Sequence, residues 1–157
     1  MNPPPNSLRI IRAEICHAEL VAPLFDAYRQ FYKQPPDYPG AHRFITERLK
    51  ANESVIFLAM LEREGDSRAV GFAQLYPAFS SISMKRVWIL NDLFVVPEAR
   101  KQGVGGALME SARQLAVSTA SKELILATAI DNLSAQSLYE KLGYKKDVEF
   151  HRYALGV

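Results

Sequence analysis

A single stretch in the second half of the chain constrains the fold more than any other feature. Residues 90–106 read LNDLFVVPEARKQGVGG. The run from Trp88 to Val96 has the apolar, β-branched composition of a buried strand, and Pro97 ends that strand because proline has no backbone N–H. Good helix formers follow the glycines from Ala107 onward. The stretch therefore predicts a strand, a tight glycine-rich turn and the beginning of a helix.

This turn has the properties of an anion-binding site. The N–H groups in the first turn of a helix are unpaired and lie at the positive end of the helix dipole, and glycines let a ligand approach the backbone closely. Arg100 and Lys101 add positive charge. We therefore expect a pyrophosphate here. The spacing matches neither a P-loop, which needs Lys followed by Ser or Thr, nor the dinucleotide fingerprint of a first βαβ unit.

Composition limits the class of protein. The chain has 157 residues, of which 48% are hydrophobic and 23% charged, so we expect one globular domain (8–157) behind a flexible, proline-rich N-terminus (1–7). A net charge of +2 gives no argument for nucleic-acid binding. No apolar run has the roughly 18 residues of a membrane span, and no signal peptide pattern is present. With Cys16 as its one cysteine, the chain fits a reducing compartment, and we expect a cytoplasmic protein.

Hydrophobic periodicity predicts a mixed α/β order with an antiparallel front half and a parallel crossover at the glycine turn. The expected strands are 8–13, 55–61, 69–79, 86–96, 123–129 and 148–155. The expected helices are 18–32, 41–50, one from the glycine turn to about residue 118, and 132–142, with Gly143 as the stop of the last. Residues 34–40 are expected to form a loop, and residues 64–67 a hairpin turn.

A second motif follows one strand after the glycine turn. Residues 132–144 read NLSAQSLYEKLGY, which has the pattern N-x-x-A-x-x-x-Y-x-x-x-G-[FY]. Taken singly, Asn132 is explained as a helix cap and Tyr139 as a core residue. Together with R-x-x-G-x-G after a strand that ends V-x-P, the motif resembles the GCN5-related N-acetyltransferase (GNAT) superfamily. The resemblance covers residues 8–157 and is nearest the branch that acetylates histones, polyamines or amino acids. It implies a mixed sheet of six to seven strands, flanked by helices, with a splayed central strand pair.

The resemblance also implies acetyl-CoA as acyl donor. The backbone of Leu93 and Val95 would pair with the pantetheine arm, and an N–H of Leu93 or Phe94 would polarise the thioester carbonyl. Asn132 and Ser137 would contact the arm from the opposite side. The residues expected to hold the pyrophosphate are Arg100, Lys101, Gln102, Gly103, Val104, Gly105, Gly106 and Ala107.

For the chemistry, the resemblance implies direct attack of an amine within a ternary complex. Tyr139 lies where the family places its general acid. Asp92 is the candidate base, with a structural hydrogen-bond acceptor as the competing interpretation. Asn91 cannot take a proton, and because neighbouring strand residues face opposite ways, only one of the pair can face the cleft. Cys16 lies far from this strand in the sequence, which argues against an acyl-carrying thiol.

The acceptor is less constrained by the sequence. The first two helices and their loop are rich in aromatic residues and carry a carboxylate, a combination that suits an organic cation, although each aromatic residue singly is also a core residue. The expected acceptor residues are Tyr28, Phe31, Tyr32, Asp37 and Asn91. We expect a small primary amine, such as a polyamine or an amino acid, and a homodimer. His17, His42 and His151 have no ligand spacing, so no metal is expected.

Three other functions remain open at this point. The acceptor could be a peptide N-terminus or a protein lysine. The fold could serve as a non-catalytic sensor of acyl-CoA, against which Tyr139 and the intact glycine turn argue. An antibiotic-modifying enzyme would need an acidic acceptor cleft, but the first two helices carry many basic residues beside their acidic ones.

Overall fold

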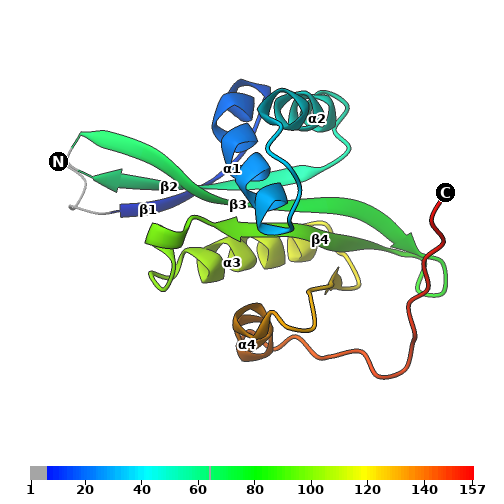
Figure 1. Ribbon diagram of the computed structural model, residues 1–157. Helices are drawn as coiled ribbons and strands as arrows, with labels where there is room; N and C mark the ends of the chain where they lie inside the picture. Colours follow the sequence, from blue (N-terminus) through cyan, green and yellow to red (C-terminus); the bar gives the residue numbers. More distant parts are fainter. Residues whose placement is uncertain (1–6, 64) are drawn as a thin grey trace. The chain divides into compact units, whose positions relative to one another are not determined.

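The computed structural model describes residues 7–63 and 65–157, which fall into two compact units, Met1–Ala127 and Thr128–Val157 (Figure 1). Most of the expected flexible N-terminus lies outside the described residues, and Ser7 already belongs to the first strand. The glycine turn and the strand before it lie in the first unit, whereas the second motif lies in the other.

The first unit is built on a five-stranded sheet in the order β1-β2-β3-β4-β5. Its strands are β1 (Ser7–Arg12), β2 (Val55–Arg63), β3 (Asp66–Ser80), β4 (Lys85–Val95) and β5 (Leu124–Leu126). The first three junctions are antiparallel, and β4 pairs with β5 in parallel. The antiparallel front half and the parallel crossover after the glycine turn are thus as expected.

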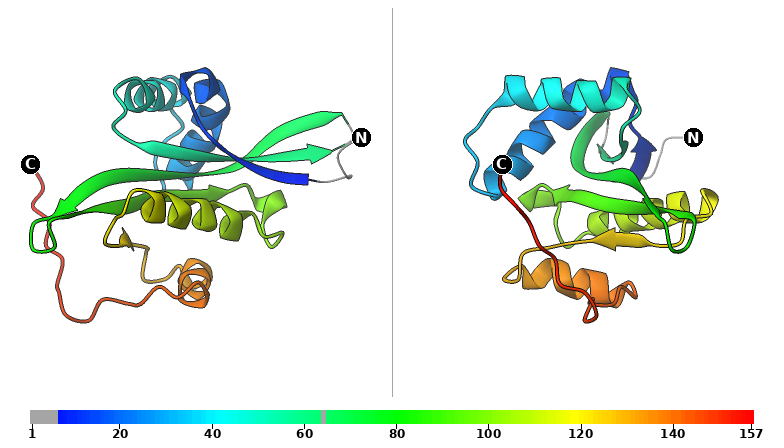
Figure 2. Two further views of the ribbon diagram at one scale, coloured as in Figure 1. Left: turned by 180° about the vertical axis from the view of Figure 1, so that it is seen from behind. Right: turned by 90° about the vertical axis from the view of Figure 1, so that its right-hand side faces the viewer.

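Helices cover both faces of this sheet (Figures 1 and 2). The helix α1 (Ala18–Phe31), preceded by the short 3-10 helix η1 (Ile15–His17), packs with α2 (Tyr38–Lys50) on one face. The other face is covered by α3 (Val104–Ser118), which follows the 3-10 helix η2 (Pro97–Ala99).

The second helix starts earlier than the sequence suggested. We expected a loop through residue 40, but α2 begins at Tyr38. Asp37 caps it by accepting a hydrogen bond from the backbone N–H of Gly40 at 2.9 Å, and Pro39 lies in its first turn, where a missing N–H costs nothing. A cap and a proline that looked like loop signals therefore belong to the beginning of the helix.

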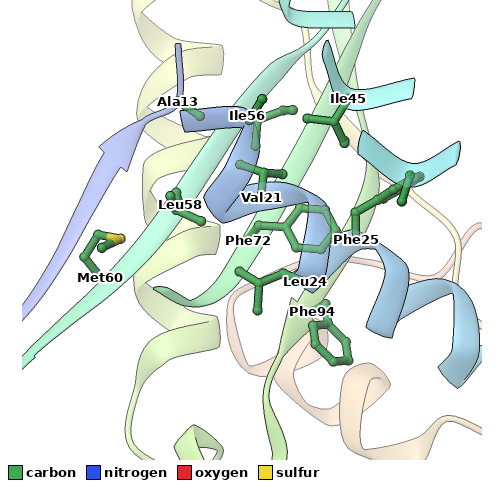
Figure 3. Packing of buried hydrophobic residues seen from close by; sticks show 12 residues of the cluster. Ala13, Val21, Leu24, Phe25, Ile45, Ile56, Leu58, Met60, Phe72 and Phe94 are labelled. Atoms are coloured by element: carbon green, nitrogen blue, oxygen red, sulfur yellow. The ribbon is translucent and has the colours of Figure 1, made fainter. Parts of the chain in front are cut away.

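The main core lies between α1, α2 and the sheet (Figure 3). At its centre, Phe72 of β3 is fully buried, and its ring contacts Phe25 and Tyr28 of α1 edge-on at centroid distances of 6.2 and 6.0 Å. Beside it on β3, Gly71 is required by close approach, because a Cβ there would lie 2.7 Å from the carbonyl oxygen of Phe94. The central strands β3 and β4 are therefore held by both backbone and side-chain packing.

The strand β4 contains a bulge that changes which way its backbone faces. Gln74 pairs with Asp92 and Leu75 with Leu90, so Asn91 has no partner on β3. The backbone N–H of Trp88 donates to Glu123 on the β5 side, whereas that of Val96 donates to Val70 on the β3 side. Trp88 and Val96 are an even number of residues apart, so in a regular strand their N–H groups would point to the same neighbouring strand. The extra residue at the bulge has reversed the alternation of backbone direction along β4.

The sheet opens at the same place. The strand β5 pairs with β4 only from Trp88 to Leu90. Within the first unit, β5 ends opposite Leu90. The edge of β4 from Asn91 to Val95 therefore has no β5 residue paired with it. This is the expected splayed strand pair.

Two strand expectations were wrong. The fifth strand is limited to Leu124–Leu126 instead of 123–129, and residues 148–155 form no strand, so the described residues contain five strands instead of six to seven. The side chains of Val148, Phe150 and Tyr153 are 88, 78 and 90% exposed. Alternating polarity marks a face that a strand would bury, but a strand forms only where a partner supplies its hydrogen bonds.

The second unit contains one helix, α4 (Leu133–Lys141). It ends as expected at Gly143, whose φ of +91° is the left-handed conformation that glycine tolerates. The N–H of Gly143 donates to Glu140 and that of Tyr144 to Tyr139, both at 3.0 Å, which pairs the last carbonyls of the helix.

Replacing Phe72 by alanine tests the packing of the core between α1, α2 and the sheet. We expect Phe72→Ala to lower the free energy of unfolding by about 3–5 kcal/mol, because it removes buried contacts and leaves a cavity. Urea denaturation followed by circular dichroism measures the change. Phe79→Ala on the same strand, where the side chain is 72% exposed, is the control and should change stability by less than about 1 kcal/mol. Equal losses in the two variants would contradict this account of the core.

Candidate functional site

The glycine turn presents backbone donors at the start of α3. Gly103 precedes the helix with φ +82°, and Lys101 also has a positive φ of 60°. The first i→i−4 bond of the helix runs from the N–H of Ala107 to the carbonyl of Gly103 at 3.0 Å. The N–H groups of Val104, Gly105 and Gly106 therefore precede the hydrogen-bond ladder of α3. Three donors and the positive end of a 15-residue helix point to the same side.

Side chains of the turn tie it to the end of β4. The Nε of Arg100 donates to the carbonyl of Val95 at 2.9 Å, and its guanidinium lies 6.0 Å from the centre of the Phe94 ring. The side-chain amide of Gln102 donates to the carbonyl of Glu98 at 2.9 Å. These bonds hold the turn against the end of β4, and the bond from Arg100 uses its Nε.

The open edge of β4 exposes particular backbone groups. Because the bulge reverses the alternation, Leu93 and Val95 direct their N–H and C=O groups toward the edge that β5 leaves open, whereas Phe94 faces β3. Of the two expected donors to a thioester carbonyl, the geometry therefore favours Leu93 over Phe94. The carbonyl of Val95 is already engaged by Arg100.

Asp92, the candidate base, and its neighbour Asn91 lie at the bulge. Asp92 is buried, with 4% of its surface exposed, whereas Asn91 is exposed. The carboxylate of Asp92 accepts hydrogen bonds from Gln74 Nε2 at 2.7 Å and from Asn91 Nδ2 at 3.0 Å, and the Tyr28 side chain bonds to it as well. Asn91 thus contacts Asp92 directly through its side chain, although one residue is exposed and the other buried, as expected of neighbours on a strand.

Burial and hydrogen bonding act on Asp92 in opposite directions. Loss of solvent raises the pKa of Asp92, and the hydrogen bonds from Gln74, Tyr28 and Asn91 lower it, with a net increase above its ordinary value. On β3, burial and the negative charge of Asp92 raise the pKa of Tyr76 to about 12. A carboxyl group with a raised pKa is suited to taking a proton near neutral pH.

The expected acceptor residues fall into two places. Tyr28, Phe31 and Tyr32 form an aromatic row along the end of α1, with neighbouring ring centroids 5.1 and 5.2 Å apart. Phe31 and Tyr32 are 54 and 42% exposed, whereas Tyr28 is half-buried against the core. Asp37 caps α2 and lines a separate cleft of about 250 Å³ with Phe25, Arg29, Gly40, Ala41 and Phe44.

A larger hollow lies elsewhere in the first unit. Its volume is about 510 Å³, and it is formed where β1 ends and α2 meets β2. None of the residues predicted for the site lines it; its walls include Arg12, Glu14, Lys50 and Ser54.

The second motif forms the start and middle of α4. The side-chain oxygen of Asn132 caps the helix by accepting from the N–H of Ala135 at 3.2 Å, and Ser137 is exposed. Tyr139 is buried, and its ring centre lies 6.0 Å from that of Tyr144. Asn132 therefore has the capping role that its sequence position also allowed.

Comparison with known proteins identifies the family. The model of the acetyltransferase (GNAT) family matches residues 21–144. The chain belongs to the GNAT family. It is 47% identical over 150 residues to the uncharacterized N-acetyltransferase YhfO of Bacillus subtilis, which covers 96% of this chain and 98% of that protein. It is also 34% identical over 138 residues to a probable acetyltransferase of Haemophilus influenzae, covering 88 and 90% of the two chains.

The fold agrees with this assignment. A crystal structure described as a probable acetyltransferase superposes with a TM-score of 0.88 at 44% identity, covering 95% of this chain and 97% of that one. The protein is therefore an acetyltransferase of the GNAT type, and the predicted family and fold class are confirmed. The names of these three relatives do not say which acceptor each one acetylates.

Two polar residues of this GNAT domain were missed by sequence reasoning. Gln74 is fully buried within the apolar β3, and its isolation among apolar residues was a usable signal. Asp26 is buried on α1 and accepts from the backbone N–H of Asp37 at 2.9 Å, so it holds the loop before α2. The sequence signal was an acidic residue on the apolar stripe of a helix beside Phe25.

Two negative observations apply to the described parts of the chain, 7–63 and 65–157. No helix there combines the length and apolar character that crossing a bilayer requires. Over the same ranges, no cluster of three or more His, Cys, Asp or Glu side chains is arranged to hold a metal ion.

The burial of Asp92 predicts how its contribution to stability changes with pH. The pKa of Asp92 is higher in the folded protein than in the unfolded chain, so the folded state binds the proton more tightly. The free energy of unfolding therefore falls as pH rises from the pKa of the unfolded chain through that of the folded protein. Relative to Asp92→Asn, we expect the free energy of unfolding of the wild type to decrease as pH rises above about 4. Urea denaturation of both proteins from pH 4 to 8 measures it. A difference that does not vary with pH would contradict the raised pKa.

Proposed function

We propose that the protein transfers an acetyl group from acetyl-CoA to a small primary amine, such as a polyamine or an amino acid, by direct attack within a ternary complex. The observation that carries this proposal is the coincidence of two backbone features. The donors at the start of α3 follow directly on a strand edge that β5 leaves open. A molecule with a pyrophosphate at one end and an amide-bearing arm fits such a pair of features.

The turn supports the pyrophosphate end. Val104, Gly105 and Gly106 supply N–H groups, and the terminal nitrogens of Arg100 supply charge. No Cβ contact limits approach at Gly106, where an added side chain would meet nothing within 4 Å. The arm would then follow β4 toward the bulge, pairing with the backbone of Leu93 and the N–H of Val95.

The reaction requires proton movements at two atoms. The nitrogen of a neutral amine attacks the thioester carbonyl carbon, the C–S bond breaks, and the product amide loses the proton that the amine nitrogen carried. Asp92 accepts that proton, directly or through water, and Tyr139 donates one to the departing sulfur. The N–H of Leu93 stabilises the negative charge that develops on the carbonyl oxygen.

The aromatic row supports an organic cation as acceptor. Exposed faces of Phe31 and Tyr32 attract an alkylammonium group. The expected carboxylate of Asp37 caps α2 and lines a separate cleft, so it is not part of this aromatic row. Exposed Asn91, next to Asp92, offers a hydrogen bond close to the reacting nitrogen. These exposed groups support a small amine as the acceptor.

Thiol release from acetyl-CoA in the presence of an amine panel tests the proposal. We expect release with spermidine or free amino acids and little with a lysine-containing peptide or a peptide N-terminus. Preference for the peptides would overturn the small-amine acceptor. Tight binding of coenzyme A without release for any amine would instead favour the acyl-CoA sensor.

We also propose a cytoplasmic homodimer. The support is the resemblance to the dimer-forming branch of the family and the exposed, free thiol of Cys16, which suits a reducing compartment. Light scattering after size-exclusion chromatography distinguishes a dimer from a monomer.

Charge at the glycine turn should abolish coenzyme binding. Gly105→Asp places bulk and a negative charge where the phosphates would sit, so we expect loss of measurable coenzyme A binding by calorimetry. Gly105→Asn has the same size without the charge and should weaken binding less. Wild-type affinity in the aspartate variant would refute the assignment of this turn.

Removal of one hydroxyl should separate chemistry from binding. We expect Tyr139→Phe to lower kcat by about 100-fold or more while leaving coenzyme affinity near normal, since the general acid acts only on the leaving thiolate. Tyr144→Phe, which alters the neighbouring ring of the same unit, is the control and should retain turnover. Unchanged kcat in Tyr139→Phe would remove this residue as the acid.

A further inference from the structure

A buried chain of polar side chains links Asp92 to the start of β2. Ser54, Gln74 and Asp92 are 8, 0 and 4% exposed. The hydroxyl of Ser54 donates to Gln74 Oε1 at 2.8 Å, and Gln74 Nε2 donates to Asp92 Oδ2 at 2.7 Å. The bond to Asp92 is among the shortest side-chain contacts in the described structure and has the length typical of a bond to a charged acceptor.

The chemistry of the three groups determines the direction of every bond. An ionised carboxylate can only accept hydrogen bonds, so Gln74 must present its amide nitrogen to Asp92. Its amide oxygen then faces Ser54, whose hydroxyl must donate. Ser54 therefore selects the amide orientation that serves a charged Asp92, and without this hydroxyl the amide would lose the group that holds its oxygen end.

The position of Gln74 is costly unless it serves Asp92. It lies on an apolar strand between Ala73 and Leu75, both fully buried, where an apolar side chain of similar volume would need no partner. An amide buried there is tolerated only because both of its ends are bonded. The remaining oxygen of Asp92 is held by Asn91 at 3.0 Å, so donors reach the carboxylate from two strands.

We propose that Gln74, oriented by Ser54, is a positioning residue for acetyl transfer: it holds the Asp92 carboxylate in a single orientation and stabilises its charged, proton-accepting form. This rests on the proposed function in one respect, namely that Asp92 takes the proton of the amine. Gln74 touches neither the amine nor the thioester in this scheme and acts only through Asp92.

Side chains on the neighbouring elements also interact with the Asp92 carboxylate. Asn91 on β4 and Tyr28 on α1 bond to it, and Tyr76 on β3 faces its charge. Arg48 on α2 and Glu53 face Tyr76 and are paired with each other at 2.7 Å. The pKa of Tyr76 is about 12, well above neutral pH, so the uncharged donors and burial dominate the titration of Asp92.

The test measures Asp92 itself before it measures catalysis. The carboxyl carbon of Asp92 is titrated by NMR in protein labelled with ¹³C-aspartate, with its signal assigned by its absence in Asp92→Asn. We expect Gln74→Met, which is close in volume but lacks the donor, to raise the pKa of Asp92 by about one pH unit or more. Ser54→Ala should raise it by a smaller amount, since the donor remains but its orientation is no longer held.

Thr46→Val is the control for the loss of a buried hydroxyl. Its Oγ1 is buried and has no hydrogen-bond partner among the described residues, so the substitution should leave the pKa of Asp92 unchanged. Thermal denaturation confirms that each variant is folded, and Ser54→Ala, the milder change, keeps the test informative where Gln74→Met is unstable.

The same variants are then assayed from pH 5 to 9 with the amine that gives the fastest thiol release. If the proposal holds, the rise of kcat/KM with pH moves to higher pH in Gln74→Met by the amount that the NMR pKa moves, and less in Ser54→Ala. An unchanged NMR pKa in both variants would overturn the positioning role, as would an equal shift in Thr46→Val.

The two ways of failing are distinguishable. If Asp92→Asn leaves the pH–rate profile unaltered, Asp92 is not the base, and the proposed mechanism fails at that step whatever Gln74 does. If Asp92→Asn removes the rising limb while Gln74→Met moves neither the NMR pKa nor the limb, the mechanism stands and the role given to Gln74 is refuted.

Discussion

One inserted residue in β4 determines how the first unit is organised around its candidate site. In a regular strand, Trp88 and Val96 would direct their N–H groups to the same neighbour, but the bulge at Asn91 sends them to opposite edges. The pairing with β5 stops at Leu90, just before the bulge. The backbone of Leu93 and Val95 is consequently directed to an edge that no strand of this unit covers. A regular strand would have presented the backbone of Asp92 and Phe94 there instead.

The same bulge sets the balance at Asp92. At the bulge the side chain of Asn91 bonds to Asp92, and Asp92 lies opposite Gln74 on β3. Desolvation disfavours the charge, and three hydrogen bonds favour it. An apolar residue could be buried here at lower cost, so the carboxylate is tolerated only because buried donors satisfy it. Of the two interpretations that the sequence left open, the hydrogen bonds show Asp92 as an acceptor, and its role as base stays a proposal.

The glycine turn depends on local geometry more than on packing. Two left-handed residues, Lys101 and Gly103, reverse the chain between η2 and α3, and the first ladder bond of the helix starts only at Ala107. Side-chain bonds from Arg100 and Gln102 return to backbone carbonyls before the turn. A turn with helix-start donors needs little from the rest of the fold beyond a strand that leads into it, which is why it was predictable from a short stretch of residues.

What the sequence by itself determined were the features set by neighbours along the chain. The strand, proline and glycines of residues 88–106, the cap at Asn132 and the stop at Gly143 are local, and each was predicted within a few residues. Tertiary structure decided what depends on partners distant in sequence: the bulge at Asn91, the buried pairing of Gln74 with Asp92 and Ser54, and the absence of a strand at 148–155. The alternating polarity of residues 148–155 is typical of a strand with one buried face, but it does not provide a neighbouring strand to pair with. Likewise, the lone amide of Gln74 acquired a role only when the sheet brought a carboxylate 18 positions away within 2.7 Å of it.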